Sequence, residues 1–203
     1  MFINKYVILL SSIVLLLSCD SKRSKPVVIT KAPITNIKIR IIPLGQQASC
    51  FNQQTFSIIK QYVPNAVLER AEPMPKMAYY SPRERYRADS IIHWLSRRAG
   101  KDEVIIGVTA QDISTTKDSH DDWGVMGLGN CPGHACVVSS HRVRNKNNFY
   151  KVIIHEMGHN MGLPHCNVKT CFMRDAEGHD TTDEETDFCE KCKAVLKSKG
   201  WKV

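Results

Sequence analysis

Three histidines and one glutamate stand out because their types and spacing suit metal chemistry, in a segment that reads HEMGHNMGLPH. His155 and His159 are four residues apart, so on a helix both imidazoles lie on one face and can bind one zinc ion. Gly162 can take the positive φ that ends a helix, and the chain can then turn so that His165 supplies a third ligand. Three neutral ligands leave a coordination position for water, and Glu156 is placed to accept the proton of that water.

The length of this motif makes a chance occurrence improbable. With the His and Glu content of this chain, an H-E-x-x-H match is expected by chance on the order of one time in a hundred. The further requirement for Gly162 and His165 lowers that figure about five-hundredfold. We therefore expect a catalytic zinc site, with Glu156 as general base.

Four cysteines that follow the third histidine form a second candidate metal site. Cys166 and Cys171 precede an acidic loop, and Cys189 and Cys192 follow it in a C-x-x-C pair. Two close pairs with an intervening loop are typical of a closed, all-cysteine structural zinc site. Disulfides are the alternative, because an exported protein meets an oxidising environment. We expect zinc, which makes two ions in all, one catalytic and one structural.

The N-terminus predicts export and a lipid anchor. A short apolar run over residues 6–17 has the length of a signal-peptide core and is too short to span a bilayer. It ends at Cys19 in a pattern that resembles a bacterial lipobox, although an ordinary secretory signal with an incidental cysteine is the alternative. We expect a signal peptide over residues 1–18, a polar lipid-anchored tether over 19–35 and one domain over 36–203. The expected location is that of a bacterial lipoprotein, membrane-anchored in the periplasm or at the cell surface.

Apolar periodicity along the domain alternates between strand and helix patterns. The expected elements are a strand over 37–42, a helix over 52–63, a strand over 66–71, a helix over 83–99, and strands over 103–109 and 137–140. Residues 149–154 read FYKVII and predict that the histidine motif lies on a buried helix. This order predicts an α/β fold. The arginines of the 83–99 helix form either a solvated face or, less favoured, an anion-binding face.

Several other residues carry weaker signals. Residues 137–142 form either an edge strand that lines the cleft or an internal strand. Cys50, Cys131 and Cys136 allow one disulfide, of which Cys131–Cys136 is the local candidate, or remain free thiols. A cluster of acidic residues and a histidine is either a cation site or, as favoured, part of a solvated loop: Asp118, His120, Asp121 and Asp122.

The motifs together resemble the archaemetzincin family of metzincin peptidases. The resemblance rests on H-E-x-x-H-x-x-G-x-x-H-C-x4-C-x-M followed by C-x-x-C, and on upstream segments such as GLG at 127–129 and ACVVSSHR at 135–142. It spans roughly residues 37–192. It implies a compact metzincin-like α/β domain with a mixed twisted sheet, an active-site helix carrying the H-E-x-x-H motif and a C-terminal four-cysteine zinc subsite. It also implies that Met173 forms the Met turn beneath the metal.

We therefore expect a zinc metallopeptidase that acts on peptide or protein substrates, most simply as a monomer. One alternative is a non-catalytic zinc-binding module on the same fold, but a purely structural metal does not need Glu156. The other is a nucleic-acid binder, which the net charge of +8 and the pI near 9.1 would suit. The export signal counts against it, and we expect no nucleic-acid partner.

Overall fold

The computed structural model describes residues 37–45 and 49–203. The predicted signal peptide, the lipidation site Cys19 and the tether up to residue 35 lie outside the described residues. Within the described part of the chain, no helix combines the length and the apolar character needed to cross a membrane.

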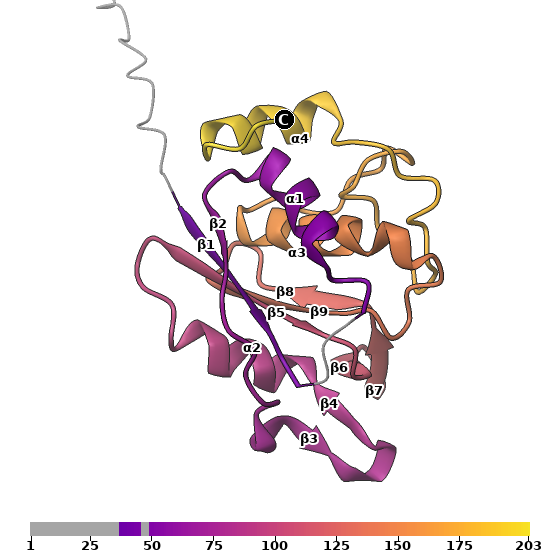
Figure 1. The fold of residues 1–203 in the computed structure, drawn as a ribbon. Helices are drawn as coiled ribbons and strands as arrows, with labels where there is room; N and C mark the ends of the chain where they lie inside the picture. The colour runs from indigo at the N-terminus through magenta and orange to yellow at the C-terminus, as the bar shows by residue number, and fades with distance from the viewer. Residues whose placement is uncertain (1–36, 46–48) are drawn as a thin grey trace, which may run out of the picture. The chain divides into compact units, whose positions relative to one another are not determined.

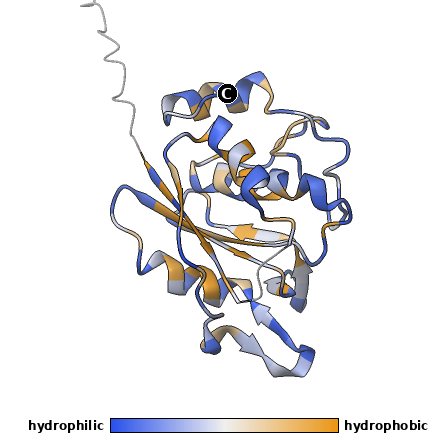
Figure 2. Cartoon of the chain, viewed as in Figure 1, coloured by the Kyte–Doolittle hydropathy of each residue, from blue (hydrophilic) through white to orange (hydrophobic). Residues whose placement is uncertain are grey.

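A five-stranded mixed sheet organises the domain, with strand order β2-β1-β5-β9-β8 (Figure 1). The strands are β1 (Lys38–Pro43), β2 (Ala66–Leu68), β5 (Glu103–Thr109), β8 (Gly127–Gly129) and β9 (Ala135–Ser139). The first four strands in this order are parallel, and β8 alone pairs antiparallel, at one edge. The central strands β5 and β9 are nearly continuous apolar runs, as buried parallel strands require, and Figure 2 shows this along β5. In β1 the polar residues Lys38 and Arg40 alternate with buried isoleucines.

Helices cover both faces of this sheet. α1 (Gln53–Tyr62), α3 (Phe149–Asn160) and α4 (Glu190–Ser198) contribute to one core, and α2 (Ala88–Ser96) contributes to the other. Alternate residues of β5 point into the two cores, with Ile106 on the α3 side and Ile105 on the α2 side. The sheet therefore gives α3 a rigid platform.

A second, four-stranded sheet has the order β3-β4-β6-β7. Its strands are β3 (Tyr79–Tyr80), β4 (Arg85–Arg87), β6 (Ile113–Lys117) and β7 (His120–Val125). Three single-turn 3₁₀ helices complete the described elements: Lys76–Ala78, Ser81–Arg83 and Lys146–Asn148. β6 and β7 form a hairpin, and β7 continues through Met126 into β8, so the hairpin is tied to the edge of the main sheet.

The structure corrects the predicted helix over 83–99, which begins only at Ala88. Residues 85–87 form a strand because Arg85 is buried and needs acidic partners: its guanidinium contacts Asp112 at 3.2 Å and Asp122 at 2.5 Å. The prediction of a solvated or anion-binding arginine face is therefore wrong for Arg85, which is buried and paired with carboxylates. The strand predicted over 66–71 is also shorter than expected and ends at Leu68.

Candidate active site and metal centres

α3 and the turn after it bring three histidines together. His155 and His159 lie one turn apart on α3, which ends at Asn160. Gly162 has φ of +95°, the conformation predicted for it, and the chain then reverses to bring in His165. One ligand atom from each of the three side chains can be chosen so that all lie within 4.8 Å of one another. This spacing suits imidazoles that surround a single metal ion.

Each histidine is oriented through its Nδ1 atom. Nδ1 of His155 donates to the carbonyl of Phe172 at 2.6 Å, and Nδ1 of His159 donates to the carbonyl of Leu163 at 2.7 Å. Nδ1 of His165 lies 3.3 Å from a carboxylate oxygen of Asp175. These partners fix the tautomer in which Nε2 carries the free lone pair, as metal-binding histidines require. No sequence pattern pointed to Asp175 in this role.

Burial keeps the two helix histidines neutral. It lowers the pKa of His155 to about 3, and the neighbouring His159 adds to the effect. Burial also lowers the pKa of His159. A neutral imidazole is the form that binds metal, so the site is preorganised at neutral pH.

Glu156 lies beside this centre in a slot formed by strand β8. Its side chain is buried, and burial raises its pKa to about 8. A Cβ atom placed on Gly127 would lie 2.6 Å from Oε1 of Glu156, and one placed on Gly129 would lie 3.1 Å from Oε2. The two glycines on this edge strand therefore create the space that the carboxylate occupies. Alternating glycines in a strand signal such a close approach, although they do not reveal what approaches.

Met173, which the resemblance assigns to a Met turn, packs against the helix that carries two of the histidines. Its side chain is fully buried, and its sulfur packs against the backbone of Gly158, between the two helix ligands. Phe172, whose carbonyl orients His155, is its chain neighbour. This segment therefore contacts α3 between its two histidines and also orients the imidazole of His155.

The four cysteines gather into a second cluster. The Sγ atoms of Cys166 and Cys189 are 3.6 Å apart, those of Cys171 and Cys192 3.8 Å, and those of Cys189 and Cys192 3.6 Å. Four thiolates around a tetrahedral zinc, with Zn–S near 2.3 Å, would be about 3.8 Å apart. A disulfide would need about 2.05 Å. The donor set and its spacing therefore fit a metal ion.

A cleft of about 770 Å³ opens onto the histidines. One wall is formed by the β6–β7 hairpin and β8, and the other by the loop over residues 174–182. The two walls approach each other where Trp123 packs against Gly178. The edge strand on this cleft is β8, whereas β9 is internal, between β5 and β8, so the edge-strand option for 137–142 is wrong.

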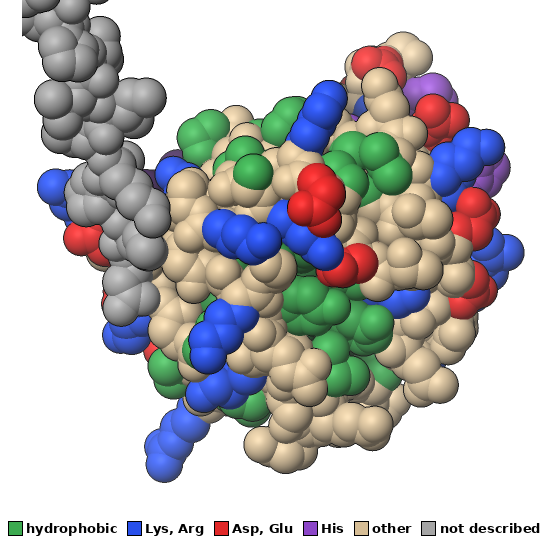
Figure 3. All heavy atoms as spheres, turned by 90° about the horizontal axis from the view of Figure 1, so that it is seen from above, with side chains coloured by type: hydrophobic (Ala, Val, Ile, Leu, Met, Phe, Trp, Pro, Cys, Tyr) green, Lys and Arg blue, Asp and Glu red, His purple; other side chains and the backbone are tan. Residues whose placement is uncertain are grey.

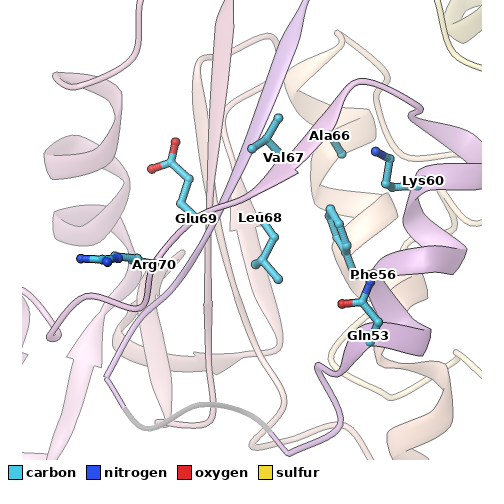
Figure 4. A pocket seen from close by; sticks show the side chains of 8 residues that line it. All are labelled: Gln53, Phe56, Lys60, Ala66, Val67, Leu68, Glu69 and Arg70. Carbon is cyan, nitrogen blue, oxygen red and sulfur yellow. The ribbon is translucent and has the colours of Figure 1, made fainter.

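A second, shallower groove of about 520 Å³ runs between α1 and β2 (Figure 4). It lies at the opposite edge of the main sheet from β8. Its charged lining residues are Lys60, Glu69 and Arg70, with apolar and amide side chains between them. These residues do not form either of the two candidate metal clusters.

The weaker signals are resolved by the structure. Cys50, Cys131 and Cys136 are free thiols, so the suggested Cys131–Cys136 disulfide does not form. Asp122 is paired with Arg85 and Arg87, which explains why the candidate cation cluster around it is not among the metal-binding groups of the described residues.

On the face seen in Figure 3, basic side chains are interspersed with carboxylates.

A three-histidine centre with a buried carboxylate beside it, at the edge of a mixed sheet, is the arrangement of a metal-dependent hydrolase. Residues 52–198 match the model of Peptidase family M54. The chain therefore belongs to this family and is a zinc-dependent peptidase with a three-histidine site.

Known relatives agree with this assignment and confirm the archaemetzincin resemblance. The archaemetzincin of Natronomonas pharaonis is 26% identical over 175 residues, which cover 78% of this chain and 98% of the relative. That of Nanoarchaeum equitans is 32% identical over 131 residues, covering 64% of this chain and 73% of the relative. Among solved structures, the archaemetzincin of Methanopyrus kandleri has a TM-score of 0.67 at 21% identity and covers 83% of this chain and 98% of its own. The Archaeoglobus fulgidus archaemetzincin, solved in complex with malonate, has a TM-score of 0.59 at 25% identity and covers 78% of this chain and 99% of its own.

Proposed function

We propose that this peptidase uses Glu156 as its general base, with His155, His159 and His165 holding a catalytic zinc. The observation that carries the proposal is the position of the Glu156 carboxylate, buried next to the first ligand and confined by β8. When bound, zinc would supply Lewis acidity toward a water molecule and toward the peptide carbonyl.

The side chains around the metal transfer the proton and hold the ligands in position. Glu156 accepts a proton from the attacking water and delivers it to the leaving amine. Burial raises the pKa of this carboxyl group, which strengthens its affinity for the proton that it accepts. The Nδ1 partners of the histidines hold the imidazole rings in place, so the metal need not reorganise them during the reaction.

We further propose that a second zinc lies among Cys166, Cys171, Cys189 and Cys192, with a structural role. Four thiolates close the coordination sphere and leave no position for water. The segment between these cysteine pairs carries both the Met turn and the acidic loop that walls the cleft. The second metal would thus hold in place residues that the catalytic centre depends on.

Substitution of Glu156 tests the proposed mechanism. We expect Glu156→Ala to keep its zinc content, measured by elemental mass spectrometry, while peptide turnover falls by at least about a hundredfold. Glu177→Gln is the matched control, since it removes a carboxylate from the exposed rim of the same cleft. Unchanged turnover in Glu156→Ala would rule out the proposed base. If the unmodified protein and Glu156→Ala are both inactive on a broad peptide library, the result would favour the non-catalytic zinc module.

The export signal and the lipid anchor at Cys19 remain our proposal for where the peptidase works. The support is the apolar run that stops at this cysteine. A lipid on Cys19 would hold the domain at a membrane surface, where it would meet exported proteins or peptides.

A further inference from the structure

A buried acidic side chain lines the cleft that opens onto the histidines. Glu185 lines the cleft, yet only 5% of its surface is exposed. Val152 and His155, three residues apart on α3, line the same space. Because Glu185 lines the same cleft as His155, its side chain borders the space that a peptide bound at the histidines would occupy.

The carboxylate of Glu185 is only half satisfied. Oε1 accepts a hydrogen bond from the hydroxyl of Thr181 at 2.7 Å. Oε2 has no hydrogen-bond partner, and the carboxylate forms no ion pair, within the described part of the chain. Buried carboxylates are ordinarily paired with a cation, because the desolvated charge is otherwise costly.

The charged groups nearest to Glu185 are engaged elsewhere. The Nζ atom of Lys151 donates to the backbone carbonyls of Thr182 and Glu185, at 2.6 and 2.7 Å, and not to the carboxylate. Arg174 contacts the exposed Glu184 at 2.6 Å.

Asp180 receives the backbone N–H of Arg144 and the hydroxyl of Thr182. Burial raises the pKa of Glu185 in spite of the opposing effects of Thr181, Lys151 and Arg174. Among the described residues, no cation is paired with this carboxylate, so its second oxygen is available to a cation from a bound ligand.

From this arrangement we infer that Glu185 forms a specificity subsite for a basic side chain, Lys or Arg, on a substrate residue near the scissile bond. The inference rests on the proposed function, because it assigns a substrate class to the same cleft. A long aliphatic stem would lie along Val152, and the terminal cation would reach the free oxygen of Glu185. No sequence pattern points to this residue, which lies in an acidic loop where most carboxylates are solvated.

Cleavage selectivity provides the first test. Mass-spectrometric profiling of a peptide library with the zinc-loaded protein would locate the subsite, and kcat/KM would then be measured for peptides with Lys or norleucine there. We expect a preference for Lys of about 10- to 100-fold, the range for a hydrogen bond to a charged group. Glu185→Gln keeps the size of the side chain and the backbone carbonyl that Lys151 binds, and should reduce this ratio to about one. Glu177→Gln should keep the ratio of the unmodified protein.

A binding measurement separates this inference from the catalytic proposal. The zinc-loaded Glu156→Gln protein retains Glu185, and it should bind the Lys peptide about 10- to 100-fold more tightly than the norleucine peptide by calorimetry. Binding with this preference but without cleavage by the unmodified protein would overturn the catalytic proposal alone. Cleavage with no enrichment of Lys or Arg near the cut, equal binding of both peptides, or an unchanged ratio in Glu185→Gln would overturn the subsite.

Discussion

Gly127 of β8 offers a direct way to displace the proposed base. A methyl group at this position would lie 2.6 Å from both Cγ and Oε1 of Glu156 and 2.9 Å from Cδ. Carbon atoms in contact are ordinarily separated by about 3.5 Å or more, so the Glu156 side chain must move by about 1 Å. All three atoms belong to one flexible side chain, and the backbone of β8 remains paired with β9. We therefore expect Gly127→Ala to fold normally and to misplace the carboxylate.

The magnitude follows from the geometry. A catalytic group displaced by about 1 Å costs on the order of a hundredfold in rate, or about 2.7 kcal/mol in activation free energy. We expect kcat of Gly127→Ala to fall by this factor, while zinc content and the free energy of unfolding change little. Steady-state kinetics on a peptide identified by library cleavage, elemental analysis and urea denaturation would measure the three quantities. Gly100→Ala is the control, because its new Cβ would meet neighbours at ordinary contact distances of 3.4 Å and more.

A double variant distinguishes displacement of Glu156 from general damage. Glu156→Asp shortens the side chain by one methylene and relieves the contact with a methyl group at position 127. The combined Gly127→Ala and Glu156→Asp protein should then lose less activity than the product of the two single losses. Two results would refute the role of β8 in positioning the base. One is a double variant whose loss of activity equals the product of the two single losses, and the other is a Gly127→Ala protein with unchanged kcat.

Two further predictions concern the rest of the chain. Cys189→Ser should lose one of two zinc ions per chain and lower the melting temperature by several degrees, measured by elemental analysis and calorimetry, whereas unchanged metal content would favour spectator thiols. Cys19→Ala should release the protein from the membrane fraction of a bacterial host and remove the lipid mass from its N-terminal peptide, whereas unaltered fractionation would exclude a lipid anchor at this residue.

Local patterns in the sequence predicted the parts of the fold that depend on local physics. The helix over 52–63 was expected, and Asn52 caps α1 by accepting the N–H of Thr55. The strand predicted over 103–109 is β5, because a run of buried β-branched residues has few alternatives. The histidine spacing likewise predicted the three-residue cluster, since four-residue periodicity and a helix-ending glycine determine most of its geometry.

Features that depend on distant partners were not visible in the sequence. Residues 83–87 look helical until Arg85 is seen to need Asp112 and Asp122, which are far along the chain. The hairpin of β6 and β7 consists mainly of polar residues, so it carries no strong strand signal. The role of Gly127 beside Glu156 depends on a strand passing within contact distance of α3, which only the tertiary fold reveals.

The two candidate metal-binding clusters are mechanically linked through a short stretch of chain. His165 and Cys166 are consecutive residues that belong to different clusters. Phe172, which orients His155, lies directly after Cys171, and the N–H of Cys166 donates to the carbonyl of Met173. A metal ion bound by the four thiolates would therefore hold three features in place through the same bonds. These are the ligand His165, the residue Phe172 that orients His155, and Met173. The loop that carries Glu185 ends just before the C-x-x-C pair, so the same bonds would also anchor the wall of the cleft.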